Sequence, residues 1–232
     1  MESEREIPEF CSIKSISNIV VISLVLAIAI SGISTISTMM EIELLESLDA
    51  GVNFTDDELI ANDNRVSVIA SIYIIIAISS MILFYIWFYK TYKNLPSLGG
   101  KELLFSARGS VLRFFIPILC VYQPYRAMRE IWKVSDPTTQ ETNKASRKQM
   151  STPGLIKTWW ALWIITGIIG IFYLRGMEQM MSVDTIGGFI ALDYMHILTE
   201  IPMIISTVLT LFLVKKSSFN QEKKSQSKEF RN

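Results

Sequence analysis

Four stretches of the chain are apolar over about 20 residues each, and polar segments separate them. They cover residues 16–39, 66–89, 155–174 and 194–214. A helix that crosses the hydrocarbon core of a bilayer needs about 20 apolar residues, and a surface helix of a water-soluble protein shows only an apolar stripe. The pattern therefore predicts four transmembrane helices and an all-α integral membrane bundle.

A fifth apolar run, residues 111–122, is too short to cross a membrane. As a helix it would be about 18 Å long, against a hydrocarbon core of about 30 Å. Arg113 lies inside the run, and Pro117 would interrupt the backbone hydrogen bonds of a helix. We therefore expect residues 110–135 to form a re-entrant or interfacial segment between the second and third spans.

The second half of this segment has the spacing of an amphipathic helix that begins at Pro124. Its apolar face carries Tyr125, Met128, Ile131 and Trp132, and its polar face carries Arg126, Arg129, Glu130 and Lys133. Such a helix, with a basic polar face, is typical of one lying in the membrane interface. The polar residues that follow, 137–153, predict a flexible loop.

The segments outside the membrane domain of residues 16–214 are short. We expect a cytoplasmic N-terminal segment, residues 1–15, and a basic, disordered tail, residues 215–232. Between the first two spans, Thr55 and Glu58 have the spacing of a capping box that opens a short helix. In the first span, Ser31, Gly32, Ser34 and Ser37 form a small-residue face, which favours helix packing over a pore lining.

The distribution of basic residues predicts the topology. Net charge is zero, which gives no signal for nucleic acid binding. If residues 90–154 and both termini are cytoplasmic, Arg65 and Arg175 are the only bases in the outer loops, and the other 20 of the 22 lie inside. Cytoplasmic loops carry an excess of Lys and Arg, so we expect a multi-pass protein of the cell membrane with both termini in the cytoplasm.

Two clusters are candidates for chemistry. Asp193, His196 and Glu200 share one helix face, and ionisable residues in a membrane span are functional hypotheses by default. They could form a proton relay or bind a hard metal, although packing is the simpler explanation and we expect no metal site. Cys11 and Cys120 have no zinc-ligand spacing and are expected to be free thiols.

The second cluster lies on the predicted cytoplasmic side. Its residues are candidates for binding lipid or a partner protein: Lys90, Lys93, Asn94, Arg113, Arg126, Arg129, Glu130 and Trp132. Arg113, inside an apolar run, needs an anionic partner, for which Glu130 or a lipid phosphate would serve. Alternatively, the cluster is a structural network that fixes the re-entrant segment.

Several ordered motifs resemble those of a known family. They are W-F-Y-K-T-Y-K-N-L-x-x-L-G at residues 87–99, F-x-P-I at 115–118, P-Y-R-A-M-R-E-I-W at 124–132 and W-W-A-L-W at 159–163. This series, together with Gln221-Glu222, is similar to a prokaryotic membrane family known as domain of unknown function 4328. Lysines stand at 90 and 93, where the family has arginine more often. The resemblance implies a membrane fold and a prokaryotic source, but no activity.

Three functions remain open. We find no arrangement of nucleophile, base and orienting group, no phosphate-binding loop and no zinc-protease motif, so enzymatic activity and a cofactor are unsupported. The first hypothesis is a non-enzymatic interaction, scaffold or accessory module in the bilayer. It would bind anionic lipid headgroups, or a membrane or cytoplasmic protein, through its cytoplasmic segment. The second is a small transporter or channel subunit with Glu200 in its pathway, and the third is a membrane metalloenzyme.

Overall fold

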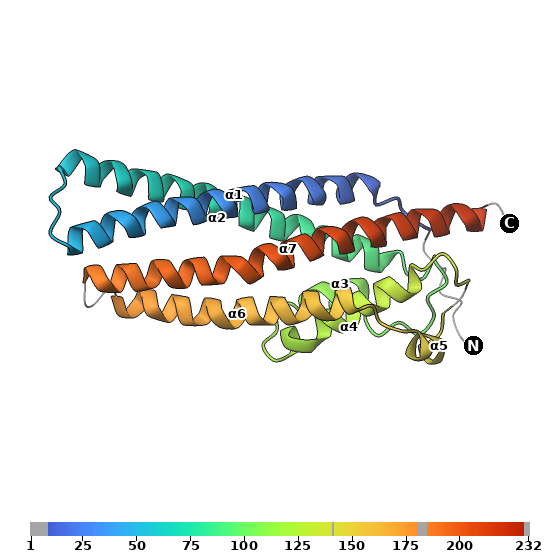
Figure 1. The fold of residues 1–232 in the computed structure, drawn as a ribbon. Coiled ribbons are helices and arrows are strands. Elements are labelled where there is room, and N and C mark those ends of the chain that lie inside the picture. Colours follow the sequence, from blue (N-terminus) through green and yellow to red (C-terminus); the bar gives the residue numbers. More distant parts are fainter. Residues whose placement is uncertain (1–8, 141, 181–184, 230–232) are drawn as a thin grey trace. The chain divides into compact units, whose positions relative to one another are not determined.

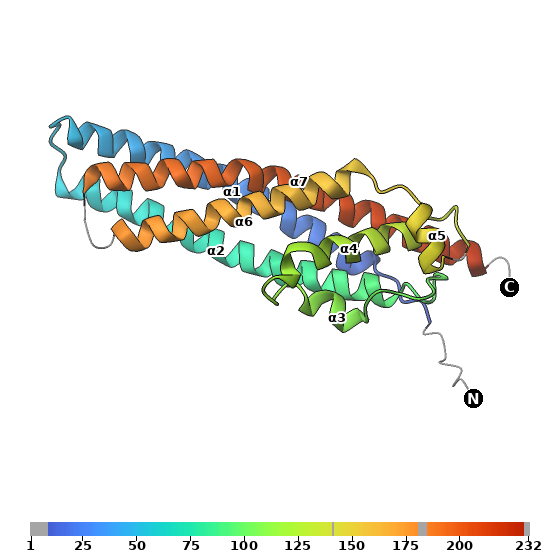
Figure 2. The same cartoon turned by 90° about the horizontal axis from the view of Figure 1, so that it is seen from below.

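The computed structural model describes residues 9–140, 142–180 and 185–229, and these residues are largely helical (Figures 1 and 2). The helices are α1 (Lys14–Asp49), α2 (Asp56–Lys93), α3 (Ala107–Leu112), α4 (Leu119–Val134), α5 (Lys144–Gln149), α6 (Gly154–Met180) and α7 (Ile186–Glu229). Within the described ranges there is no β-sheet, and Gly100 and Thr142 form an isolated bridge.

Helices α1, α2, α6 and α7 are long and apolar enough to cross a membrane, and each contains one of the predicted stretches. Many of their large apolar side chains are exposed in the isolated chain, including Ile22 at 61%, Ile75 at 65% and Leu174 at 65%. Such exposure is costly in water and neutral among lipid tails, so the chain is a multi-pass membrane protein. The prediction of an all-α membrane bundle is confirmed.

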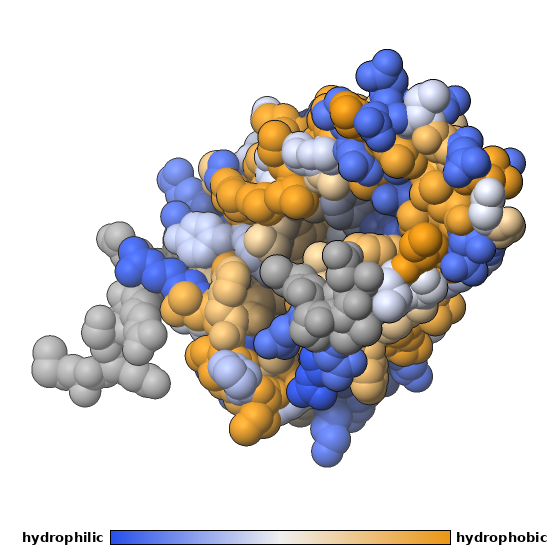
Figure 3. Space-filling model, turned by 90° about the vertical axis from the view of Figure 1, so that its left-hand side faces the viewer, coloured by the Kyte–Doolittle hydropathy of each residue, from blue (hydrophilic) through white to orange (hydrophobic). Residues whose placement is uncertain are grey.

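The helices extend beyond the predicted spans. Helix α1 continues to Asp49 and α2 begins at Asp56, so the connection between them is shorter than the sequence suggests. The Glu58 carboxylate accepts hydrogen bonds from the Thr55 backbone N–H and hydroxyl, both at 2.9 Å. This confirms the capping box, but it opens the whole of α2 and not a separate short helix. Figure 3 looks onto this end, where hydrophilic side chains gather among apolar ones.

The chain forms two compact units. Unit 1 comprises Met1–Ile22, Met81–Trp160 and Leu209–Asn232, and unit 2 comprises Ser23–Ser80 and Ala161–Val208. Each of the four long helices contributes residues to both units.

The core of unit 1 is rich in aromatic side chains. Trp87 and Phe88 of α2 are completely buried, and the Phe88 ring contacts that of Phe114 edge-on at 5.3 Å between centroids. The Trp87 indole N–H donates to the Ser218 hydroxyl of α7 at 2.9 Å. These two aromatics therefore anchor helices to one another.

A buried pair of amides joins α2, α4 and α7. Gln221 is fully buried and donates to the Thr91 carbonyl and the Ser135 hydroxyl, both at 3.0 Å. Asn94, 3% exposed, donates to the Gln221 side chain at 3.3 Å and to the Cys11 carbonyl at 2.8 Å. This network ties together segments that are far apart in the sequence.

The expectation of a disordered tail is wrong for residues 215–229, which continue α7 as a helix. Glu222 accepts hydrogen bonds from the Ser12 hydroxyl at 2.7 Å and the Ile13 N–H at 2.8 Å. Lys224 is buried and donates to the Val134 carbonyl at 2.6 Å. The polar composition reflects specific partners in unit 1 and not solvation.

The segment between the second and third spans forms two short helices, and neither is among the four that are long enough to cross a membrane. Helix α3 ends before Pro117, and α4 begins at Leu119 and passes through Pro124, the residue at which the sequence predicted its start. Pro124 lies beyond the first turn of α4, so it removes the backbone hydrogen bond that another residue at this position would donate to the Cys120 carbonyl. The Trp160 indole of α6 donates to the Val121 carbonyl at 2.8 Å, which fixes α4 beside the start of α6 (Figure 2).

The burial of α4 differs from the predicted faces. Met128 and Ile131 are fully buried, as their spacing predicts. Glu130 and Lys133, assigned to the polar face, are each 3% exposed. Both make buried hydrogen bonds within unit 1, so much of the predicted polar face is turned into the protein.

The link from α2 to α3 is pinned to the segment before α5. Gly99 adopts a φ of +89°, and a Cβ on Gly100 would lie 2.9 Å from the Leu95 carbonyl oxygen. Only glycine fits both requirements without strain. The Lys101 N–H donates to the Thr142 carbonyl at 2.9 Å, and the Thr142 N–H donates to the Gly99 carbonyl at 3.0 Å.

In unit 2 the small residues of α1 are on its buried side. Ser31, Ser34 and Ser37 are each less than 10% exposed, but a Cβ on Gly32 would meet nothing within 4 Å. The serine positions therefore form the small-residue face, and Gly32 is not part of a close helix contact.

Candidate functional site

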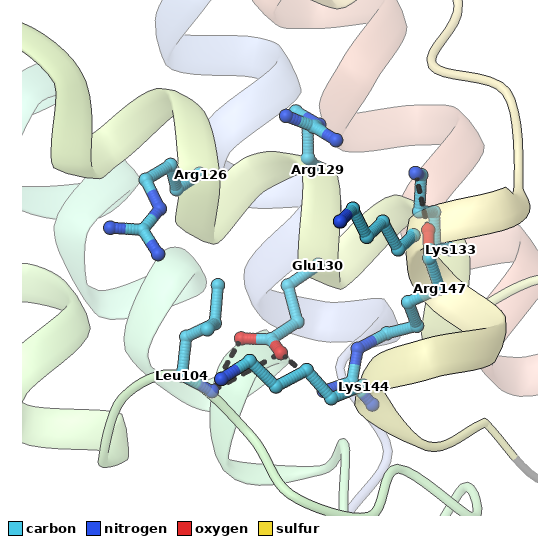
Figure 4. Close-up of a pocket in the computed structure, with 8 residues that line it drawn as sticks. Leu104, Arg126, Arg129, Glu130, Lys133, Lys144 and Arg147 are labelled. Atoms are coloured by element: carbon cyan, nitrogen blue, oxygen red, sulfur yellow. Dashed lines mark hydrogen bonds and ion pairs between the residues drawn. The ribbon is translucent and has the colours of Figure 1, made fainter.

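A pocket of about 200 Å³ lies in unit 1 between α4, α5 and the link from α2 to α3 (Figure 4). Six basic side chains and a single carboxylate line it, with one leucine: Leu104, Arg126, Arg129, Glu130, Lys133, Lys144, Arg147 and Lys148. The excess of bases makes this the most strongly charged concave surface of those found in the described residues. Which of these bases are available to a ligand depends on their existing partners.

The Glu130 carboxylate is fully paired. It accepts a hydrogen bond from the buried Tyr92 hydroxyl. Its two oxygens also lie 3.1 and 3.2 Å from the Leu104 backbone nitrogen, which donates to them. Arg147 Nη2 lies 2.9 Å from Glu130 Oε1, and both side chains are nearly inaccessible to solvent. Among the described residues that line the pocket, the one acid is therefore occupied by structural partners.

Two of the bases are also structural. Arg147 donates through Nη1 to the carbonyls of Lys101 at 2.7 Å and Thr142 at 2.8 Å, and through Nη2 to that of Glu102 at 2.7 Å. Lys133 donates to the carbonyls of Arg147 at 2.7 Å and Met150 at 2.5 Å. Burial, with Arg129 and Arg147 nearby, lowers the pKa of the Lys133 ammonium. These contacts fold α5 against α4.

Four cations remain without a salt bridge to any described residue: Arg126, Arg129, Lys144 and Lys148. The Nε of Arg129 is buried and has no hydrogen-bond partner in the described part of the chain. The guanidinium of Arg129 lies over the Tyr125 ring at 5.4 Å, and that of Arg126 over the Phe105 ring at 5.8 Å. In Figure 4 the Arg129 guanidinium is turned away from the Glu130 carboxylate, and the Arg126 guanidinium lies apart from it on the other side.

The structure brings only part of the predicted cluster together. Arg126, Arg129 and Glu130 line the pocket, whereas Lys90 and Lys93 are exposed outside its lining. Asn94 is buried in the amide network and cannot contact a lipid. Trp132 is half-buried and is not a lining residue either.

Of the two partners considered for Arg113, a lipid phosphate and Glu130, the second is wrong. Arg113 donates to the Gly109 carbonyl at 2.8 Å and lies over the Phe105 ring at 4.4 Å. Glu130 pairs instead with Arg147, because α5 folds back on α4. An aromatic face, not a carboxylate, offsets much of the cost of placing the Arg113 guanidinium beside an apolar run.

Sequence reasoning missed the contribution of α5. Lys144, Arg147 and Lys148 lie in a stretch that the composition marks as flexible. Asn143 is a residue type that favours the N-cap position of a helix, and this was the available sequence signal. In the structure its side chain accepts a hydrogen bond from the Ser146 N–H at 2.8 Å. The capping residue and its basic followers predict a short helix, but not the surface on which it packs.

In unit 2, α7 brings His196 and Glu200 together, with His196 Nε2 3.9 Å from Glu200 Oε1. The Ser34 hydroxyl of α1 lies 3.2 Å from the same His196 nitrogen. Over the described residues, no group of three or more histidine, cysteine or acidic side chains is arranged to hold a metal ion, so Asp193, His196 and Glu200 do not form one. Cys11 and Cys120 are free thiols.

Comparison with known proteins places the chain in a family without assigning it an activity. Searches of curated proteins and of solved structures gave no match. A family model matches residues 50–218, which include α2 to α6, most of α7 and every residue that lines the basic pocket. The chain therefore belongs to the family described as Domain of unknown function (DUF4328).

Proposed function

We propose that this protein is a non-enzymatic membrane module that binds the phosphate of an anionic lipid headgroup in the pocket between α4 and α5. The observation that carries the proposal is the set of four cations around a carboxylate that is already fully paired. A pocket with this balance attracts an anion, and the orphaned Arg129 Nε–H is a donor ready for one.

The residue types suit a phosphate. Arginine guanidinium groups bind phosphate oxygens with two parallel hydrogen bonds, and lysine adds charge at longer reach. Arg126 and Arg129 are held near aromatic rings, so less side-chain entropy is lost when they bind. Lys144 and Lys148 on α5 are exposed and can close on the ligand from the other side.

The membrane location of the protein favours a lipid as the source of that phosphate. The excess of basic residues on the side that carries this pocket favours a cytoplasmic orientation, where anionic lipids are abundant. Each Lys or Arg near such a surface contributes about 1 kcal/mol of attraction. In this orientation the pocket would lie near the headgroups of the cytoplasmic leaflet, and the module could anchor a partner to that lipid.

The test compares two double variants that each remove two positive charges. Arg126→Gln/Arg129→Gln changes the pocket, and Lys90→Gln/Lys93→Gln changes exposed lysines outside its lining. Purified protein in detergent is titrated with phosphatidylglycerol or with phosphatidylcholine, and bound lipid is counted by native mass spectrometry. We expect wild type and the lysine variant to retain phosphatidylglycerol, and the arginine variant to lose it at least tenfold, about 1.4 kcal/mol.

A second arm separates a lipid from a soluble ligand. Glycerol 3-phosphate, which has the headgroup phosphate but no acyl chains, is titrated against wild type by thermal unfolding. Stabilisation by this compound and by phosphatidylglycerol to the same degree would indicate a soluble phosphate ester as the ligand and would overturn the lipid assignment. Equal phosphatidylglycerol binding by the two double variants would refute the pocket altogether.

A further inference from the structure

A second site lies inside unit 2 and is independent of the proposed anion pocket. It centres on Glu200 of α7, which is 2% exposed. Its Oε2 atom is buried and accepts no hydrogen bond from any described residue. A buried polar atom without a partner is rare in a folded protein and requires an explanation.

The groups that face Glu200 come from all four helices of unit 2. Tyr73 of α2 and Ser31 of α1 lie close enough for their hydroxyls to interact with the carboxylate, and Tyr173 of α6 is also within electrostatic range. His196, on α7 itself, has its Nε2 3.9 Å from Oε1. Of these, only His196 can carry a positive charge, and within the described ranges no lysine or arginine acts on the carboxylate.

A cavity of about 170 Å³ adjoins the site. Its lining is apolar except for four hydroxyl-bearing residues: Ser31, Tyr73, Ser80 and Thr207. Its volume exceeds the roughly 30 Å³ that a water molecule occupies in the liquid, and the hydroxyls offer hydrogen bonds to water. Ser31 and Tyr73 both line this cavity and face Glu200, so they connect the two.

The Tyr73 hydroxyl is held loosely. It donates to the sulfur of Met203 at 3.2 Å, and a thioether is a weak acceptor. A hydroxyl can donate and accept at the same time, so Tyr73 can turn from the sulfur towards the carboxylate at little cost. Groups with these properties pass protons from one neighbour to the next.

We propose that Glu200 is a proton-binding site, loaded from the cavity through the Tyr73 and Ser31 hydroxyls. A hydronium ion in the cavity gives a proton to the hydroxyl oxygen as that hydroxyl gives its own proton to Glu200 Oε2. One O–H bond breaks and one forms at each step, and a water molecule and a neutral carboxylic acid remain. Through Oε1 the site also adjoins His196, whose Nε2 contacts the Ser34 hydroxyl.

The test measures proton uptake by the protein in lipid nanodiscs after a downward pH step, with a soluble pH-indicator dye. Glu200→Gln removes the acid without changing its shape, and Glu43→Gln removes an exposed acid of α1 as the matched control. We expect Glu200→Gln to lose the slow phase of uptake that wild type shows, and Glu43→Gln to keep it. Identical uptake by wild type and Glu200→Gln would overturn the proposal.

Two further measurements protect the test against a misfolded variant. Tyr73→Phe keeps the ring but removes the hydroxyl, and we expect it to slow the uptake while leaving its final amplitude unchanged. Infrared difference spectra of wild-type protein with isotope-labelled glutamate detect the C=O band of a protonated side chain directly. If the bands of buried glutamate do not change with pH, Glu200 keeps one protonation state and is a packing residue only.

Discussion

Each unit buries a glutamate, and the two differ in how completely the protein satisfies them. Glu130 in unit 1 is 3% exposed and is paired with Tyr92, Leu104 and Arg147. Glu200 in unit 2 is 2% exposed, with one histidine at 3.9 Å and an oxygen without a hydrogen-bond partner in the described residues. The two carboxylates therefore differ in pairing and not in burial, and the proton-binding role proposed for Glu200 rests on that difference.

The surroundings of the two glutamates differ in the same way. Around Glu130, unit 1 is built from side-chain bonds to backbone carbonyls and amides, such as those of Arg147, Lys133 and Gln221. Around Glu200, the helices of unit 2 present mainly hydroxyls and apolar side chains. Specific pairing gives unit 1 a fixed geometry on which the free cations of the basic pocket are held.

The largest expected effect separates the two glutamates by stability. Glu130→Gln leaves Arg147 as a buried charge without its carboxylate, and we expect a loss of about 3–5 kcal/mol in the free energy of unfolding. Glu200→Gln removes a poorly compensated carboxylate, and we expect it to be neutral or stabilising. Unfolding in mixed micelles, followed by circular dichroism, measures both variants. A loss at Glu200 as large as that at Glu130 would erase the distinction between the two sites.

A smaller effect tests how tightly each unit is packed. Gly100→Ala places a Cβ 2.9 Å from the Leu95 carbonyl oxygen in unit 1, and we expect a loss of about 1–3 kcal/mol from overpacking. Gly170→Ala, in α6 of unit 2, meets nothing within 4 Å, and we expect a gain of about 0.5–1 kcal/mol from helix propensity. The same unfolding assay compares them, and a destabilising Gly170→Ala would show a close contact at that face.

The smallest effect concerns the start of α2 in unit 2. Hydrogen bonds from the Thr55 N–H and hydroxyl lower the pKa of the exposed Glu58 carboxyl below its ordinary value of 4.5. The folded state therefore prefers the charged form. This stabilisation is complete above pH 4.5 and is lost as the pH falls through the lowered pKa of the folded state. We expect faster amide hydrogen exchange in the first turn of α2 at low pH.

Glu58→Gln is the control for that measurement, because a glutamine cannot titrate. At each pH its exchange rate is compared with that of wild type, which cancels the intrinsic dependence of exchange on pH. The two proteins should converge at low pH. A difference that persists unchanged to acidic pH would mean that the capping interaction does not depend on the charge of Glu58.

Much of the fold could be predicted from local sequence. The four candidate spans follow from apolar stretches of membrane length, and the break between α3 and α4 coincides with the short run of residues 111–122 and with Pro117. The capping box of Thr55 and Glu58 was likewise readable, because both partners lie within one helical turn. These features depend on neighbours in the sequence.

The candidate sites could be predicted only in part. Arg126 and Arg129 were found because they share a helix with Glu130, but their partners across the pocket, Lys144 and Lys148, lie on α5 in a stretch that reads as flexible. His196 and Glu200 were found for the same reason, since one helical turn separates them. The hydroxyls of Ser31 and Tyr73 that face Glu200 come from other helices, and periodicity carries no information about them.

The sequence by itself determined the membrane class, the number of spans and the short interruption between the second and third, because hydrophobic length and helix-breaking residues act locally. Tertiary structure decided which polar groups are paired. Glu130 pairs with Arg147 and not with Arg113. Asn94 and Gln221 are buried together, and residues 215–229 form a helix instead of a disordered tail. Each of these depends on a partner more than ten residues away, and composition cannot show whether a charged side chain faces water, lipid or a buried partner.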